Sequence, residues 1–255
     1  MLDCIFETGI YTVISSQISK QEQTMWFNSF NQPIGEPLPD FCAGELPSVQ
    51  ALEGQYCRLE KLSVGKHLAD LTALYGSDSP AEMWTYLPCE AASDEATVKQ
   101  WLSELERSAD PYYFSIIDKQ RNKAVGTFAL MRIDPTNRVA EMGWVIYSPE
   151  LKRSRIATEA QFLVMHHVFE TLQYRRYEWK CDSLNQPSIN AAKRLGFVFE
   201  GIFRNAVVYK GRNRDTAWFS MLPNEWQAMK PKFERWLDAS NFDENGKQLR
   251  TLQSF

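Results

Sequence analysis

The sequence lacks the patterns that mark membrane proteins, disulfide-stabilised secreted proteins and metal enzymes. None of its apolar runs approaches the roughly 20 residues needed to span a bilayer. Its five cysteines are odd in number and show no C-x-x-C spacing, which indicates reduced thiols and a cytoplasmic location. It has three histidines, and neither a zinc signature nor a G-x-S-x-G motif. We therefore expect no metal and no membrane partner.

Neither sign of charge dominates the chain. The sequence holds 28 Lys and Arg against 32 Asp and Glu, a net charge of −4. A balance this even argues against a surface that binds nucleic acid or acidic membrane along its whole extent. There is no internal repeat and no low-complexity segment. With 255 residues, we expect one large domain with extensions, and no nucleic-acid partner.

The N-terminal part carries no targeting pattern. Residues 1–24 lack a basic start and an A-x-A-like cleavage site, so we expect no signal peptide. Met25 is an alternative translation start, which a native peptide from within residues 2–24 would exclude. Residues 28–47 contain four prolines and two glycines, which predicts an extended arm on the domain surface. The expected divisions are an N-terminal extension and arm at 1–53, a central domain at 54–222, and a C-terminal helical segment and tail packed on the same domain at 223–255.

Hydrophobic periodicity predicts a mixed α/β domain, of α+β type with a mixed sheet. Runs rich in β-branched and aromatic residues alternate with stretches in which apolar residues recur at helical spacing. The predicted order is β-α-α-β-β-β-α-β-α-β-β. The predicted strands are 55–62, 112–117, 124–133, 139–147, 176–182, 197–199 and a hairpin of 202–209 with 216–222; the predicted helices are 66–75, 93–108, 158–172, 187–195 and 226–237, the last interrupted at Pro231.

A cationic loop stands between a predicted strand and a predicted helix. The strand at 139–147 stops at a Ser-Pro pair, and residues 152–155 (KRSR) precede the helix at 158–172. The first turn of a helix leaves N–H groups unpaired and carries partial positive charge, which favours anions such as phosphate. The loop is therefore a candidate phosphate site, although a solvated basic turn would have the same sequence.

Several motifs around this loop agree with one known family. Residues 152–157 (KRSRIA) stand where that family has a loop of pattern Q/R-x-x-G-x-G/A, and residues 158–160 (TEA) are a familiar continuation. The later motifs, in order, are N-x-x-S at Asn185 and Ser188, LGF at 195–197 and EG at 200–201. Over residues 54–222 the chain resembles the GNAT superfamily of N-acetyltransferases, most closely its ribosomal-protein N-terminal acetyltransferase branch.

The resemblance implies a fold and a co-substrate. The GNAT acyl-CoA N-acyltransferase fold has a mostly antiparallel sheet flanked by helices, with one splayed parallel pair of strands on either side of the helix at 158–172. The pantetheine arm of acetyl-CoA would enter where these strands separate, and its pyrophosphate would lie at the loop before the helix. The residues implied to bind acetyl-CoA are Val145, Ile146, Lys152, Arg153, Ser154, Arg155, Ile156, Ala157, Asn185 and Ser188.

The loop departs from the family pattern at its first glycine, which is Arg155 here. Arg155 lacks the freedom at positive φ that glycine provides. We interpret Arg155 as a residue whose side chain contacts a CoA phosphate. This contact would compensate for a loop backbone that approaches the phosphates less closely than one with glycine. The alternative is a decayed site that no longer binds CoA. Lys152, where Gln or Arg is usual, is a milder change.

Acetyl transfer to an amine needs a group that removes the amine's proton. An α-amino group has a reference pKa of about 7.7–8.0 and lysine one of about 10.4, so a base is required near neutral pH. Glu141, early in the strand that should border the cofactor, is the candidate base, and relatives often use a Glu at this place. The alternatives are a solvated strand charge or a salt-bridge partner of a nearby arginine.

The departing thiolate needs a proton donor. Many relatives use a tyrosine seven residues after the motif asparagine, where this chain has Ala192. The resemblance points instead to Ser188 as a hydrogen-bond donor to the CoA sulfur, and to Asn185 as a residue that holds the pantetheine or the local backbone. Asn185 and Ser188 also fit an ordinary cap at the start of the helix at 187–195.

Trp84 and Tyr86, on a short irregular segment, are the candidate acceptor-binding residues, since the resemblance places this region beside the acceptor pocket. Buried packing is the alternative for two such large aromatics. Glu178, Lys180 and Asp182 alternate along one strand and therefore share a face, which we expect to be exposed to solvent.

The resemblance favours direct transfer of an acetyl group from acetyl-CoA to a primary amine, either a peptide or protein N-terminus or a small amine, by a monomer or homodimer. The alternative is a non-catalytic module of the same fold that senses an acyl-CoA or binds a protein. One observation separates the two hypotheses. Catalysis by the residues named above predicts that Glu141 and Ser188 both face one cleft beside the loop at 152–157.

Overall fold

The computed structural model describes residues 25–255, which belong to two compact units. The described part of the first unit ends at Phe41 and contains a short hairpin of β1 (Trp26–Phe27) and β2 (Pro33–Ile34). The expectations about a signal peptide, the first cysteine and an alternative start concern residues 1–24 and lie outside the described residues.

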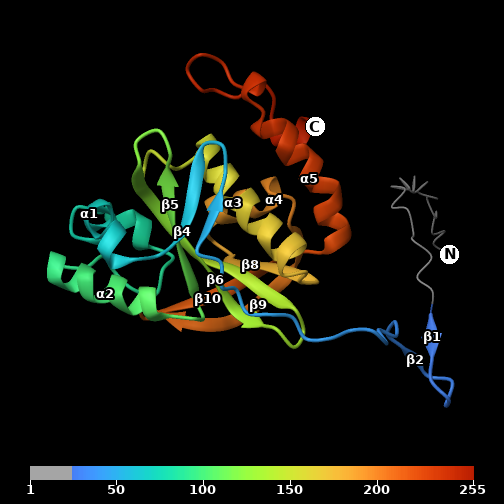
Figure 1. Ribbon diagram of the computed structural model, residues 1–255. Coiled ribbons are helices and arrows are strands. Elements are labelled where there is room, and N and C mark those ends of the chain that lie inside the picture. Colours follow the sequence, from blue (N-terminus) through green and yellow to red (C-terminus); the bar gives the residue numbers. More distant parts are fainter. Residues whose placement is uncertain (1–24) are drawn as a thin grey trace, which may run out of the picture. The chain divides into compact units, whose positions relative to one another are not determined.

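The second unit, Cys42–Phe255, is built on an eight-stranded sheet (Figure 1). Its strands are β3 (Ala51–Glu53), β4 (Cys57–Lys61), β5 (Tyr112–Asp118), β6 (Lys123–Asp134), β7 (Val139–Tyr147), β8 (Arg176–Asp182), β9 (Val198–Tyr209) and β10 (Arg212–Met221). They lie in the order β3-β4-β5-β6-β7-β8-β10-β9. All neighbours are antiparallel except β7 and β8, which are parallel. This confirms the predicted mixed sheet.

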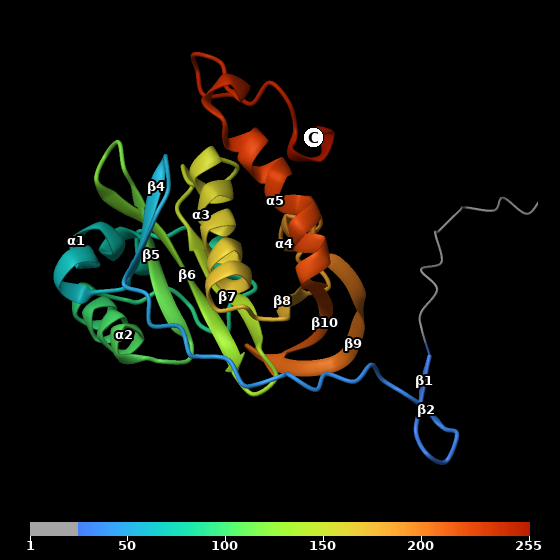
Figure 2. The ribbon, with the colours of Figure 1, turned by 45° about the vertical axis from the view of Figure 1, so that its right-hand side comes forward.

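Helices cover both faces of this sheet (Figures 1 and 2). They are α1 (Val64–Tyr75), η1 (Ala81–Trp84), α2 (Glu95–Arg107), α3 (Arg155–His166), a π-helical turn η2 (His167–Thr171), α4 (Gln186–Arg194), α5 (Pro223–Leu237), η3 (Ala239–Asn241) and η4 (Leu252–Ser254). One core cluster joins α1 and α2 to the sheet, and a second joins α3, α4 and α5 to its other face. None of the helices described has both the length and the apolar character of a membrane-spanning segment.

The sheet begins inside the predicted arm. β3 pairs with β4, although residues 51–53 were assigned to the arm. The hydroxyl of Tyr112 donates to the carbonyl of Val49 over 2.8 Å, and that of Tyr174 donates to the carbonyl of Glu45 over 2.8 Å. Residues 45–53 are therefore bound along this unit as an extended segment that ends in a sheet strand.

Three elements differ from the sequence-based prediction. α5 continues through Pro231, because buried Trp226 and Phe233 hold both of its halves against α3. β9 is one strand without the break predicted at residues 200–201, since shifts of register against β10 absorb its irregularities. The polar character of the tail from Ser240 predicts a position on the domain surface, but Leu252 is fully buried in the core cluster of α3.

β7 and β8 pair over only part of their length. Their register runs from Val139 opposite Arg176 to Met142 opposite Trp179 and extends no further among the described residues. A β-bulge follows in β7 at Trp144, whose φ is 50°. Beyond the bulge the backbone groups of the two strands do not bond to each other, as expected for a splayed parallel pair.

Candidate active site

The cationic loop leads directly into α3, which begins earlier than predicted. The Ser154 hydroxyl accepts a hydrogen bond from the N–H of Ala157 over 3.1 Å and donates to the carbonyl of Leu151 over 2.7 Å, so Ser154 is the N-cap. Lys152 and Arg153 are exposed and form no ion pair with any carboxylate of the described residues. The loop thus presents uncompensated positive charge at a helix N-terminus.

Arg155 explains how the loop tolerates the missing glycine. It is the first residue of α3, and the left-handed residue of the loop is Arg153, with a φ of 61°. Position 155 therefore needs no glycine. The Arg155 guanidinium lies over the rings of Tyr56, at 4.2 Å, and Phe242, at 5.4 Å. The side chain packs against the turn before β4 and the segment after α5.

Glu159 fastens α3 to the sheet and was missed as a structural residue by the sequence reasoning. Its carboxylate accepts hydrogen bonds from the backbone N–H groups of Gln55, Tyr56 and Cys57 over 2.6, 2.7 and 2.7 Å. The side chain is buried. Gly54 leaves room for it, because a Cβ there would lie 2.6 Å from the Glu159 carboxyl carbon. Only the TEA run in the sequence draws attention to this residue.

Asn185 and Ser188 lie together at the start of α4. Asn185 is the N-cap, and its side chain accepts from the N–H of Ser188 over 3.2 Å. The Ser188 hydroxyl accepts from the indole N–H of Trp179 over 2.9 Å. Trp179 and Cys181 belong to the core cluster under α3 and α4, so this pair lies on the α3 face of β8. The capping interpretation is therefore realised. The Ser188 hydroxyl also hydrogen-bonds the Cys181 thiol, which opposes the rise in the pKa of that thiol caused by burial.

Glu141 lies on the opposite face of the sheet within a buried charge cluster. Lys180 contacts its Oε2 at 2.9 Å and Arg132 contacts the same oxygen at 3.3 Å. Lys180 also contacts Glu178 at 2.6 Å, and Arg176 contacts Glu178 at 2.7 Å. Burial raises the pKa of the Glu141 carboxyl above its usual range, against the opposing effects of Lys180 and Arg132.

The prediction that Glu178, Lys180 and Asp182 face solvent was wrong. Glu178 and Asp182 are buried, and the Lys180 side chain is only 6% exposed. The cause is coverage by distant residues. β10 places the Trp218 ring 3.8 Å from the Lys180 ammonium, and Phe203 of β9 stacks on that ring with 4.4 Å between centroids.

The prediction that Glu141 and Ser188 both face one cleft beside the loop at 152–157 was wrong. They flank the point at which β7 and β8 stop pairing, Glu141 on one face of the sheet and Ser188 on the other. Any arrangement that uses both residues must therefore pass between the two strands.

Comparison with known proteins places this geometry in a family. The sequence model of the acetyltransferase (GNAT) domain matches residues 59–198. The chain belongs to the GNAT acetyltransferase family. A GCN5-related N-acetyltransferase from Brucella melitensis has a similar structure, with a TM-score of 0.82 and 46% identity, covering 85% of this chain and 98% of that one.

Curated relatives of this acetyltransferase are more distant. The uncharacterized N-acetyltransferase p20 of Bacillus licheniformis is 30% identical over 159 residues, which cover 62% of this chain and 89% of p20. The ribosomal-protein-serine acetyltransferase of Escherichia coli is 30% identical over 87 residues, covering 34% of this chain and 48% of that protein. The chain is an N-acetyltransferase with the GNAT fold, and the similarity extends to a ribosomal-protein acetyltransferase.

The two aromatic candidates of the acetyltransferase differ in position. Trp84 is only 1% exposed, packs against Tyr75 and Trp101, and donates its indole N–H to Ser79 over 2.8 Å. This burial favours packing over contact with an acceptor. Tyr86 is partly exposed, and its hydroxyl donates to the carbonyl of Leu184, just after β8, over 3.1 Å. Tyr86 therefore remains the candidate on the Glu141 side of the strands.

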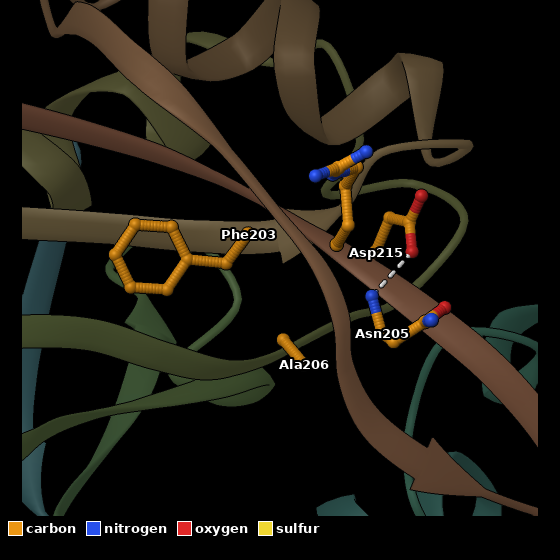
Figure 3. A pocket seen from close by; sticks show the side chains of 5 residues that line it. Phe203, Asn205, Ala206 and Asp215 are labelled. Atoms are coloured by element: carbon orange, nitrogen blue, oxygen red, sulfur yellow. Dashed lines mark hydrogen bonds between the residues drawn. The ribbon is translucent and has the colours of Figure 1, made fainter.

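An open hollow of about 810 Å³ marks the bulge of β9 (Figure 3). Asn205, with a φ of 51°, donates its N–H to Asp215 over 2.8 Å on one side of the hollow, and the Phe203 ring turns away from this pair. The hydrogen bond from Asn205 lowers the pKa of Asp215. Through the stack of Phe203 on Trp218, the rim of the hollow contacts the charge cluster of Glu141.

Proposed function

We propose that this acetyltransferase moves an acetyl group from acetyl-CoA directly to a primary amine of a protein N-terminus or a small molecule. The donor fits the residues present. Lys152 and Arg153 are exposed and have no carboxylate partner in the described chain, and the N–H groups of Arg155 and Ile156 in the first turn of α3 are left without an acceptor there. Val145, Ser154 and Ala157 belong to the same strand end and turn, whereas Ile146 is buried in the core cluster of α1 and α2.

The donor supplies the acetyl group as a thioester, and residues of the chain handle the protons. We assign the acceptor side to the face that carries Glu141, because that face is opposite the loop. Both cations of Glu141 contact Oε2, and no hydrogen bond joins Oε1 to another described residue. Oε1 is thus the oxygen that takes the proton from the acceptor amine. This buried carboxylate, with one oxygen held and the other free beside the end of strand pairing, is the observation that carries the proposal.

Ser188 and Asn185 complete the assignment on the donor side. Ser188 is held by the indole of Trp179 and by the cap of Asn185, and its hydroxyl hydrogen would turn from the Cys181 thiol to the sulfur of the departing CoA. Asn185 keeps α4 in the register that holds Ser188 there. The acceptor is proposed as an amine between Tyr86 and Glu141. The similarity to a ribosomal-protein-serine acetyltransferase favours N-terminal peptides as the first acceptors to screen.

The donor assignment is tested by calorimetric titration of acetyl-CoA into the wild type and into Lys152→Ala/Arg153→Ala. We expect the variant to bind roughly 100-fold more weakly or worse, because hydrogen bonds between charged groups contribute about 1.5–3 kcal/mol each. Both side chains are exposed, so the melting temperature should not change. The matched control is Lys99→Ala/Arg107→Ala, which removes two exposed cations of α2 and should bind normally.

Two results would contradict the proposal. A folded wild type that binds no acetyl-CoA would favour the non-catalytic alternative and turn the search to protein partners. Equal affinities of the wild type and the loop variant would show that the phosphates lie elsewhere.

A further inference from the structure

Lys180 is a buried lysine held on three sides. Its ammonium lies 2.9 Å from Glu141 Oε2, 2.6 Å from Glu178 Oε2 and 3.8 Å from the centroid of the Trp218 ring. It follows Trp179, the last residue of β8 that pairs with β7. The ammonium therefore has a fixed position beside the carboxylate to which we assign the proton transfer, at the place where the strands part.

The partners of Lys180 are themselves fixed. Arg176 bonds Glu178 over 2.7 Å and also bonds Glu200 of β9 through two nitrogens, at 2.7 and 2.5 Å. The Ser220 hydroxyl of β10 donates to Glu200 over 2.7 Å. A row of alternating charge thus runs from the edge strand to Glu141. These ion pairs and hydrogen bonds restrict the position of the Lys180 ammonium.

The charges around Glu141 balance only when Lys180 is present. Three carboxylates (Glu141, Glu178, Glu200) face three cations (Lys180, Arg176 and Arg132 of β6). Arg132 is an exposed partner, with 60% of its side chain accessible, whereas Lys180 is 6% exposed. An ion pair shielded from water interacts more strongly than one in water, so Lys180 is the main charge that opposes protonation of Glu141.

We infer that Lys180 is the positioning residue of the acetyl-transfer site, which binds Glu141 Oε2 so that Oε1 faces the acceptor amine as an ionised base. The inference rests on the proposed function. Lys180 itself need not touch either substrate. Because burial already raises the pKa of Glu141, loss of the lysine raises it further, and a carboxyl that is protonated at neutral pH cannot accept the proton of the amine.

The test compares pH profiles of kcat/KM for wild type, Lys180→Met and Lys180→Arg, measured as release of free CoA thiol with an N-terminal peptide or amine that the wild type acetylates. Methionine keeps the apolar stem and removes the charge. For Lys180→Met, we expect the acid limb of the kcat/KM profile to move to higher pH by about one unit or more. At neutral pH, kcat/KM should fall roughly 10-fold or more, and the deficit should shrink as the pH rises. Arginine should restore the limb, and the affinity for acetyl-CoA should change in neither variant.

A matched control separates this role from folding. Lys61→Met also removes a half-buried lysine over an aromatic ring, that of Tyr112 at 4.1 Å, but on β4 and away from Glu141. Its acid limb should not move. A Lys180→Met profile lowered by the same factor at every pH, with a lower melting temperature, would make Lys180 merely structural and overturn the inference. Absence of any thiol release by the wild type would instead remove the proposed function on which the inference rests.

Discussion

Replacing Glu141 by Gln is expected to slow acetyl transfer by roughly 100- to 10,000-fold near neutral pH, the usual contribution of a general base. Glutamine keeps the shape of the side chain and an oxygen for Lys180 and Arg132, but it cannot take the proton of the amine. The calorimetric affinity for acetyl-CoA should stay within a few-fold of the wild type, since the cationic loop lies on the other side of the strands. Single-turnover release of CoA thiol measures the loss.

The pH dependence of the Glu141→Gln variant separates a lost base from a damaged fold. An α-amine with a pKa of about 7.7–8.0 loses its proton to water as the pH rises, so the rate of the variant should climb toward that of the wild type through this range. The exposed Glu234→Gln of α5 is the control and should behave as wild type. A deficit of equal size at all pH values would contradict a base at position 141. Full activity of the variant would assign the proton to another acceptor.

The sequence was sufficient for the architecture, because the information there is local. The patterns that indicate a strand, a turn and an amphipathic helix at 139–166 lie in consecutive residues. The structure contains each of these elements. Alternation along β8 places Tyr177, Trp179 and Cys181 on one face, and this face packs into the core. The parallel pairing of the two strands around α3 was predicted from the family motifs and their spacing. Secondary-structure propensity and hydrophobic periodicity do not predict which strands pair.

The environment of the candidate site could not be predicted in the same way. Alternation shows that Lys180 and Glu178 share a face, but their burial depends on Trp218 and Phe203, which arrive from a hairpin later in the chain. The burial of Trp84 likewise depends on α1 and α2. The role of Arg155 depends on Tyr56 and Phe242, which lie far from it in sequence on either side. Local patterns thus indicated candidate residues and missed what surrounds them.

Replacing Glu159 by Ala is expected to lower the free energy of unfolding by about 3–6 kcal/mol, a large part of the 5–15 kcal/mol typical of a domain. Three backbone N–H groups would lose their acceptor: that of buried Cys57, that of half-buried Tyr56 and that of exposed Gln55. The Arg155 guanidinium packs over the Tyr56 ring, so the turn beside the cationic loop should become more mobile without Glu159. Acetyl-CoA should therefore bind more weakly. Urea denaturation and calorimetry measure the two effects.

Gly54 provides the control for this prediction, because it meets the same carboxylate from the other side. An alanine Cβ at position 54 would lie 2.6 Å from the carboxyl carbon of Glu159, which three N–H groups hold in place, so Gly54→Ala should also be destabilising. In Gly54→Ala/Glu159→Ala the clash disappears. The double variant should therefore lose less stability than the sum of the single variants, by about 0.5–3 kcal/mol. Additive losses would mean that the effect of alanine at position 54 does not depend on Glu159, and would contradict the role of this carboxylate in holding the turn.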